Sequence, residues 1–370
     1  MKFQQSRILH IQWDCERMNL RMKAFIAPLV FCFTLVLAQK GTSSLLHAES
    51  SLKLFDTHVH NSDIKRFGKE FYTYPDSFPD LNSSFSMTDF AESIGAPNSL
   101  NPLPNVTVSV SRVILMELEK QNNSFVAGAL EAEFFQETAD RCNADPITNC
   151  GGAVVAGIVA SAPLEKGGDA VQEYVKHLKG GLAPLLVGIR QGLWTDDEMY
   201  LFSDPSFIQG VQALGEAGLV FDLLIHKESL HPEATSLVDA APNTTFNLNH
   251  LGYPDIRNAS ALAQWQADLS ELARRPNVYC KMSGLPQSYG APGWSADDFV
   301  PYVAAALAAF GAARVNFAGN WFVLEDEEWE GTYPTMLAAV FGALAKAGVE
   351  AGSEDMEMIL EKTAARLYGA

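Results

Sequence analysis

After residue 52 the chain alternates short apolar runs with longer stretches in which apolar residues recur at helical spacing. The short runs are apolar on both faces, which is typical of strands buried in a parallel sheet. Eight strands are predicted, over residues 52–59, 112–118, 153–161, 185–190, 219–225, 245–249, 278–282 and 314–318. Amphipathic helices are predicted between them, over residues 125–141, 169–178, 205–217, 259–274, 297–310 and 333–347.

This alternation predicts an α/β protein in which eight parallel strands close into a (β/α)8 TIM-type barrel. An open, doubly wound sheet is the competing architecture. No Gly-x-Gly-x-x-Gly turn follows any of the strands, so the usual nucleotide-binding signature of such a sheet is missing from the sequence. The barrel is the favoured interpretation, and it takes residues 51–370 as one domain.

Two segments of this domain interrupt the alternation. Residues 61–104 are aromatic and proline-bearing, and they follow the first strand directly. A long segment in that place is predicted to be an inserted lid or wall over the mouth of the barrel. Residues 353–370 predict a final helix that packs outside the barrel.

Residues 1–50 are predicted to be a targeting segment. Residues 24–38 are apolar apart from Thr34, basic residues precede them, and the run ends in Val36-Leu37-Ala38, a suitable cleavage site. A signal peptide around residues 22–38 predicts a secreted or lumenal protein. An uncleaved anchor and an organelle presequence stay open as alternatives.

Features of the predicted domain agree with secretion. Glycosylation sequons predict a glycoprotein, and they begin at Asn82, Asn105, Asn122, Asn243 and Asn258. Cys142 and Cys150 flank a short polar loop and are spaced for a disulfide. Cys280 lies in an apolar strand and is expected to be a buried thiol.

The 370-residue chain carries a formal net charge of -18, and its first fifty residues are net basic, so the barrel itself is strongly acidic. Such a body repels phosphate backbones, which argues against nucleic-acid partners and against anionic membranes once the leader is removed. A small-molecule substrate is expected instead. A homodimer is compatible with the sequence.

The first strand contains Asp56-Thr57-His58-Val59-His60. Side chains alternate along a strand, so His58 and His60 point to one face with α-carbons about 6–7 Å apart. That separation lets two ring nitrogens approach a shared cation, at about 2.0–2.1 Å for zinc. The alternative is a structural strand in which two histidines meet by chance.

In a barrel, chemistry is expected where the strands run into the loops that follow them. Polar residues stand at these strand ends although the strands are apolar, and they are His58, His60, Glu117, Arg190, His226, His250, Lys281 and Asn320. Four of the eight histidines of the chain fall in this set. Their convergence favours a functional site, and a strand-end ion pair is the alternative role for Arg190 and Lys281.

Seven motifs occur in order along these strands and strand ends. They are FDTHVH at residues 55–60, APLE at 162–165, VGIRQ at 187–191, FDLLIH at 221–226, NHLGYP at 249–254, NVYCKMSG at 277–284 and RVNFAGNW at 314–321. Together they resemble the amidohydrolase-related family, and most of all its lactonase-like branch, which acts on sugar acids and on aromatic-degradation intermediates. The resemblance covers residues 52–370.

The resemblance implies a barrel of the metal-dependent hydrolase superfamily. In such a site a metal or cationic group polarises the carbonyl, water attacks, and a carboxylate on the eighth strand takes the proton of the water. His58, His60 and His226 match the metal-binding positions of the family. The site is expected to hold at most one divalent ion, with zinc as the first choice, and a metal-independent site is the alternative. Catalytic roles fall to His250, Asn320, Glu117 and Lys281, and substrate binding to Arg190, Trp194 and Trp321.

Two residues depart from the family pattern. Where two-metal relatives have a bridging lysine or glutamate, this chain has Arg190, so a binuclear site is not expected. Where the eighth strand usually ends in Ser-Asp-Trp, this chain has Gly319-Asn320-Trp321. An amide does not accept a proton at neutral pH, so Glu117, His250 or Asp326 would have to be the base.

The sequence therefore predicts a hydrolase that opens a lactone or similar cyclic ester of a small hydroxylated acid. A decarboxylase or hydratase on the same scaffold is one alternative. A catalytically inactive barrel that binds sugar acids or a protein is the other, and Asn320 is the residue that favours it.

Overall fold

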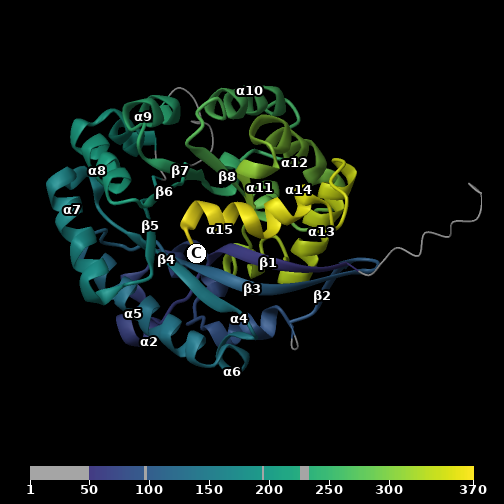
Figure 1. Cartoon of the computed structure of the whole chain (residues 1–370), viewed down its shortest axis with the longest axis horizontal. Coiled ribbons are helices and arrows are strands. Elements are labelled where there is room, and N and C mark those ends of the chain that lie inside the picture. The colour runs from purple at the N-terminus through teal and green to yellow at the C-terminus, as the bar shows by residue number, and fades with distance from the viewer. Residues whose placement is uncertain (1–49, 96–97, 194–195, 226–232) are drawn as a thin grey trace, which may run out of the picture. The chain divides into compact units, whose positions relative to one another are not determined.

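The computed structural model describes residues 50–95, 98–193, 196–225 and 233–370 (Figure 1). A parallel sheet runs through them in the order β1-β3-β4-β5-β6-β7-β8-β9. Its strands are β1 (Ser50–Val59), β3 (Val106–Met116), β4 (Val154–Ser161), β5 (Leu186–Arg190), β6 (Val220–Leu223), β7 (Thr245–Leu248), β8 (Val278–Met282) and β9 (Val315–Phe317). Every neighbouring pair is parallel, as expected for strands joined by crossover connections.

The two ends of this sheet meet at the strand that carries the histidine pair. Val59 forms a parallel bridge with Trp321, and the amide of His60 donates to the Trp321 carbonyl at 2.7 Å. Asp56 adds a second link, because its Oδ1 accepts from the amide of Gly319 at 2.8 Å and its Oδ2 from the Tyr333 hydroxyl at 2.8 Å. The predicted eight-stranded (β/α)8 barrel is thereby confirmed, nearly closed at the ends of β1 and β9.

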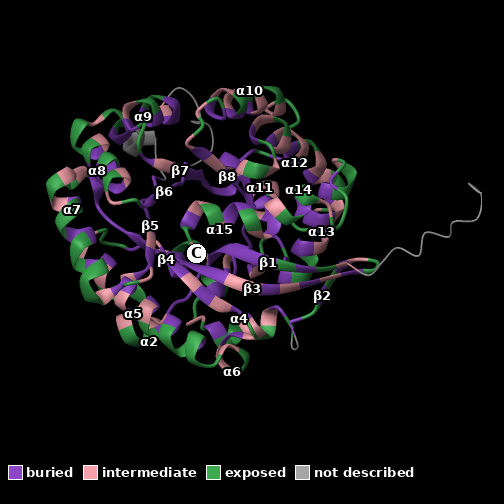
Figure 2. Ribbon diagram, in the orientation of Figure 1, coloured by how far each residue is buried: buried purple, intermediate pink, exposed green. Residues whose placement is uncertain are grey.

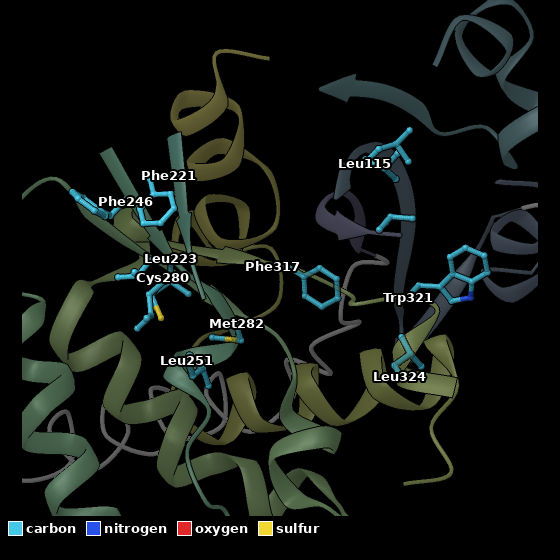
Figure 3. Packing of buried hydrophobic residues seen from close by; sticks show 14 of the residues in the cluster. Leu115, Phe221, Leu223, Phe246, Leu251, Cys280, Met282, Phe317, Trp321 and Leu324 are labelled. Carbon is cyan, nitrogen blue, oxygen red and sulfur yellow. The ribbon is translucent and has the colours of Figure 1, made fainter. Parts of the chain in front are cut away.

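Helices surround the barrel and turn their apolar faces toward it. Figure 2 shows the strands buried and the exposed residues concentrated on the outer helices. The helices that follow β3 to β9 are α5 (Phe125–Ala144), α6 (Pro146–Cys150), α7 (Gly168–His177), α8 (Pro205–Glu216), α9 (Thr235–Ala240), α10 (Leu262–Leu272), α11 (Leu285–Tyr289), α12 (Ala296–Phe310) and α13 (Tyr333–Lys346). Figure 3 shows Phe221 of β6 beside Phe246 of β7, with ring centroids 5.9 Å apart in the apolar core.

The segment between the first two predicted strands is not one uniform lid. It folds into α2 (Ile64–Phe67), α3 (Tyr74–Ser77), α4 (Met87–Ser93) and β2 (Leu100–Leu103). The stretch around α3 lies at the mouth of the barrel, where it lines the cavity described below. β2 instead pairs antiparallel with the first residues of β3, a strand that the sequence analysis had not predicted.

The C-terminal segment corrects a prediction. α14 (Glu354–Glu357), the short turn Met358–Lys362 and α15 (Thr363–Tyr368) are helical as expected. However, α15 crosses the barrel (Figure 1), and its Ala364 and Tyr368 pack in a cluster with Phe55 of β1 and Val220 of β6. The prediction that this helix packs outside the barrel was wrong because periodicity shows that a face is apolar but not which surface covers it.

The cysteines behave as their surroundings predict. Cys142 and Cys150 form a disulfide with α-carbons 5.5 Å apart, joining the end of α5 to α6. Cys280 is a free, buried thiol. Within the described residues, no helix has both the length and the apolar character needed to span a membrane, and the predicted signal segment lies outside the described residues.

Candidate active site

A cavity of about 460 Å³ opens at the ends of the strands, within the usual size range of small-molecule sites. Its walls come from the loops after several strands and from the α3 stretch, which is where barrel enzymes place their chemistry. It is lined by His60, Thr73, Tyr74, Ser77, Phe78, Leu118, Glu119, Arg190, His250, Tyr253, Asn320 and Val323. Four residues singled out from the sequence therefore meet on one cavity: His60, Arg190, His250 and Asn320.

The histidine pair converges as its spacing predicts. The Nε2 atoms of His58 and His60 are 3.1 Å apart, and both side chains are buried. His60 Nδ1 faces the Met116 carbonyl at 3.0 Å, so Nδ1 carries the proton and Nε2 a lone pair. Arg190 Nη1 lies 3.3 Å from His58 Nε2, so this nitrogen accepts from the arginine in one tautomer of His58 and donates to His60 Nε2 in the other.

Arg190 is held in place by Glu117. Its Nε donates to Glu117 Oε1 at 2.6 Å, and its Nη2 donates to the Glu117 carbonyl at 2.7 Å. The other carboxylate oxygen of Glu117 lies 3.2 Å from the ammonium of Lys120. Burial by itself raises the pKa of Glu117, but Arg190 and Lys120 outweigh it and hold that pKa below its ordinary value. Glu117 therefore positions Arg190, and its role as a base stays a prediction.

His250 sits on strained backbone. Its φ is 53°, and Leu251 and Tyr253 are also in the left-handed region, with φ of 55° and 51°. Such strain persists only where surrounding contacts enforce it and is concentrated at functional sites. His250 Nδ1 lies 2.8 Å from the Ser283 hydroxyl. Gly284 packs against the ring so closely that a Cβ there would lie 2.7 Å from His250 Cβ, so the turn requires glycine.

Asn320 stands beside the histidines. Its amide N–H donates to the His58 carbonyl at 2.9 Å, its φ of 56° is again in the left-handed region, and its side chain interacts with His60. The side chain is buried and lines the cavity. It is therefore placed to orient a bound water or carbonyl oxygen, because an amide both donates and accepts hydrogen bonds.

The three histidines are neutral at neutral pH. Burial is the main cause that lowers the pKa of His58 and His250 well below the usual value, and the nearby cations Lys281 and Arg190 add to it. Burial, followed by Arg190, lowers the pKa of His60 to about 3. A neutral imidazole offers a lone pair, which both a metal ligand and a proton acceptor require.

Other predicted site residues lie elsewhere. Lys281 is buried inside the barrel and paired with Asp222, away from the cavity lining. Trp321, labelled in Figure 3, is buried in the core. Its ring centroid lies 5.3 Å from that of Phe90. Asp326 Oδ1 accepts from the Glu328 amide at 2.8 Å and does not line the cavity. His226 and Trp194 lie outside the described residues. The roles predicted for all these residues stay predictions.

Sequence reasoning missed Glu119 and Tyr253 in the cavity wall. Glu119 follows β3 two positions after Glu117, so period-two alternation gave a signal for it. Tyr253 belongs to the NHLGYP motif but was not assigned a role. Thr73, Tyr74 and Phe78 come from the long insertion, where no periodic pattern indicates which side chains face the site.

The sequence profile of the amidohydrolase family matches residues 55–370, and the chain belongs to this family. Among curated proteins, an L-fucono-1,5-lactonase of Burkholderia multivorans is 33% identical over 145 residues, covering 37% of this chain and 49% of that protein. An L-rhamnono-gamma-lactonase of Scheffersomyces stipitis is 29% identical over 188 residues, covering 45% of this chain and 56% of that protein. The chain thus matches about half the length of these relatives.

Solved structures support the fold. An amidohydrolase from Burkholderia multivorans, crystallised with zinc, superposes with a TM-score of 0.65 at 20% identity, covering 85% of this chain and 99% of that one. A 2-pyrone-4,6-dicarboxylic acid hydrolase from Pseudomonas putida superposes with a TM-score of 0.58 at 15% identity, covering 86% and 98%. These likenesses show the amidohydrolase barrel.

Proposed function

We propose that the protein hydrolyses lactones of small sugar acids, opening the ring by attack of water on the carbonyl. The observation that carries this proposal is the meeting of a fixed cation, Arg190, a neutral imidazole, His250, and an amide, Asn320, on one cavity at the mouth of the barrel. The lactonase names of the curated relatives support the choice of substrate class.

Arg190 is the group that meets the developing charge. Its Nη1 faces the histidines, while Glu117 fixes its other nitrogens through hydrogen bonds that need not move during the reaction. A preorganised cation stabilises the oxyanion of the tetrahedral intermediate more than the neutral carbonyl, which lowers the barrier. After ring opening the same cation faces the product carboxylate.

His250 is the proposed general base. Its pKa is lowered, so the ring is neutral and accepts the proton of the attacking water at Nε2 when Nδ1–H donates to Ser283. The proton then passes to the ring oxygen as the C–O bond breaks, which yields the hydroxy acid. Asn320 orients the attacking water.

The pair His58 and His60 fits a shared cation. The two Nε2 atoms are 3.1 Å apart, a separation that suits two ligands of one zinc ion, and binding of the ion would replace the contact of His58 Nε2 with Arg190. A bound divalent ion would act as a Lewis acid on the carbonyl. Among the described residues no group of three His, Cys, Asp or Glu side chains is arranged for a metal, and the predicted third ligand, His226, lies outside them.

A pH-stat screen of sugar-acid lactones tests the proposal. The protein is dialysed against chelator and assayed with and without added zinc, with spontaneous hydrolysis subtracted. We expect hydrolysis of at least one aldonolactone above the spontaneous rate. If every lactone is left intact in both conditions, the hydrolase assignment fails and the binding-protein alternative takes its place.

We also propose that the chain is a secreted glycoprotein. All five sequon asparagines are exposed, and the disulfide Cys142–Cys150 suits an oxidising compartment. When the protein is expressed in a eukaryotic secretory host, it should be recovered from the culture medium, and its mass should fall after treatment with peptide N-glycosidase. Retention in the cell without any mass change contradicts this proposal.

A further inference from the structure

A second cavity adjoins the first and shares three of its walls. It has a volume of about 630 Å³, and Phe78, Tyr253 and Val323 line both cavities. We call the first the inner cavity and the second the outer cavity. The outer cavity is therefore the adjoining space for a ligand in the inner cavity that is longer than its reactive ring.

The outer cavity contains polar atoms without a protein partner. The amide nitrogen and oxygen of Gln287 and the hydroxyl of Ser288 are buried and make no hydrogen bond within the described part of the chain. Leaving such groups unpaired destabilises a fold, so a ligand or water in the cavity would gain hydrogen bonds when these side chains turn toward it. A side-chain amide is both donor and acceptor and suits hydroxyl groups.

Aromatic rings line the same cavity. Tyr289 and Trp329 join the shared Phe78, and Trp329 is fixed because its Nε1 donates to the carbonyls of Val323 and Leu324 at 3.1 and 3.0 Å. Flat aromatic surfaces with a few convergent polar groups are suited to a ring that has apolar faces and a polar edge. Asp255 and Arg257 both line the cavity, so it has no excess charge to select an ion.

We propose that the preferred substrate is the lactone of a glycosylated sugar acid, with the lactone ring in the inner cavity and a neutral glycosyl ring in the outer cavity. This inference rests on the proposed lactonase function. Hydroxyl groups of the glycosyl ring would pair with Gln287 and Ser288, while its C–H face would lie on the aromatic side chains. Only the ester bond of the lactone is hydrolysed, and the glycosidic bond stays intact.

The test compares D-glucono-1,5-lactone with the two disaccharide lactones built on it, cellobionolactone and melibionolactone. We expect kcat/KM for at least one disaccharide lactone to exceed that of the parent by about tenfold, which corresponds to about 1.4 kcal/mol. In Gln287→Leu this preference should fall toward one, with the parent rate unchanged. Because the sequon residue Asn258 also lines the outer cavity, wild type and Asn258→Gln from the secretory host are both assayed, and the preference is expected in Asn258→Gln.

A structural role for Gln287 predicts the opposite effect on stability. Because Leu removes an unpaired buried amide, Gln287→Leu should keep or raise the melting temperature while it removes the preference. The matched control is Gln264→Leu, which changes an exposed glutamine on α10 and should leave both quantities as in wild type.

The outcomes separate the two proposals. If the parent lactone is hydrolysed but neither disaccharide lactone is preferred, or if Gln287→Leu keeps the preference, the glycosyl site is refuted and the lactonase function stands. If no lactone is hydrolysed, the lactonase function fails. Calorimetric titration with cellobionic and melibionic acids then shows whether the outer cavity binds a glycosyl ring. Binding that weakens in Gln287→Leu supports the outer site, and absent or unchanged binding refutes it.

Discussion

Two groups of buried polar side chains lie inside this barrel, and they differ in how completely they are paired. Within the barrel, the Tyr368 hydroxyl accepts from Asn247 Nδ2 and donates to Asp222 Oδ2, both at 2.9 Å, and Asp222 pairs with Lys281. At the mouth, His58 Nδ1 has no partner among the described residues, and the Nε2 atoms of His58 and His60 lie 3.1 Å apart. The inner side chains are joined to one another, whereas His58 keeps a ring nitrogen without a protein partner among the described residues.

This difference in pairing distinguishes structural residues from catalytic residues better than residue type does. Lys281 and Arg190 are both buried cations at strand ends. Lys281 belongs to the paired interior, while Arg190 also lines the cavity. Substitutions in the interior group should therefore change stability, and substitutions in the mouth group should change turnover.

The largest effect is expected at His250. His250→Ala removes the proposed base, and kcat for a lactone substrate should fall by about 10²–10⁴, the usual contribution of general base catalysis. The matched control is His177→Ala, an exposed histidine at the end of α7, which should retain full activity. Steady-state kinetics at pH 7.5, an ordinary assay pH, checks both, and equal activity of the two variants would remove His250 from the mechanism.

A large loss of stability is expected at Lys281. Lys281→Met leaves Asp222 as an uncompensated buried charge and should lower the free energy of unfolding by about 3–5 kcal/mol. The double variant Asp222→Leu with Lys281→Met should recover part of this loss. Urea denaturation measures it, and a single variant as stable as wild type would show that the pair does not hold the interior together.

A smaller effect is expected at Tyr368 of α15. Tyr368→Phe removes two hydrogen bonds from the barrel interior and should lower the free energy of unfolding by about 1–3 kcal/mol, with kcat of the folded enzyme preserved. Tyr200→Phe, at a side chain that is 65% exposed, is the control. If Tyr368→Phe instead lowered kcat at unchanged stability, the interior group would belong to the catalytic machinery.

The smallest effect is a pH dependence of stability. The pKa of His60 is about 3 in the folded protein and 6.5 in the unfolded chain, so between these values the unfolded chain binds more protons. The contribution of His60 to stability is therefore lost as the pH falls from 6.5 toward 3, by at most about 1.4 kcal/mol per pH unit.

Asp56 acts in the opposite direction in part of this range, because burial raises its pKa to about 6. The measured quantity is therefore the difference in unfolding free energy between wild type and His60→Asn, in chelator, at pH 7 and pH 5. This difference should shrink at pH 5. A difference that is independent of pH would mean that His60 is not buried as a neutral ring.

The barrel was predictable from the sequence because its strands are apolar on both faces and regularly spaced, so local pattern and fold agree. The meeting of His60, Arg190, His250 and Asn320 followed from the rule that strand ends converge. Which side chains enter the cavity did not follow. Glu117 and Glu119 both follow β3, yet Glu119 lines the cavity and Glu117 does not. The ion pair of Lys281 with Asp222 joins β8 to β6, and no local pattern in the sequence indicates it.

The C-terminal helix shows the same limit. Its amphipathic pattern indicated a packed helix, but Tyr368 reaches Asp222 across 146 positions of sequence, a contact that no local signal contains. β2 was missed for a related reason, since a four-residue strand with a proline becomes a strand only through its pairing with β3.

The most direct test of the central claim is a crystal structure of the protein with an aldonolactam, the ring amide that corresponds to a hydrolysed lactone. The claim predicts that the lactam ring lies in the inner cavity, with its carbonyl oxygen at Arg190 and Asn320 and its carbonyl carbon accessible to a water held by His250. A lactam bound elsewhere, or its carbonyl turned away from Arg190, would contradict the claim that this cavity opens lactones.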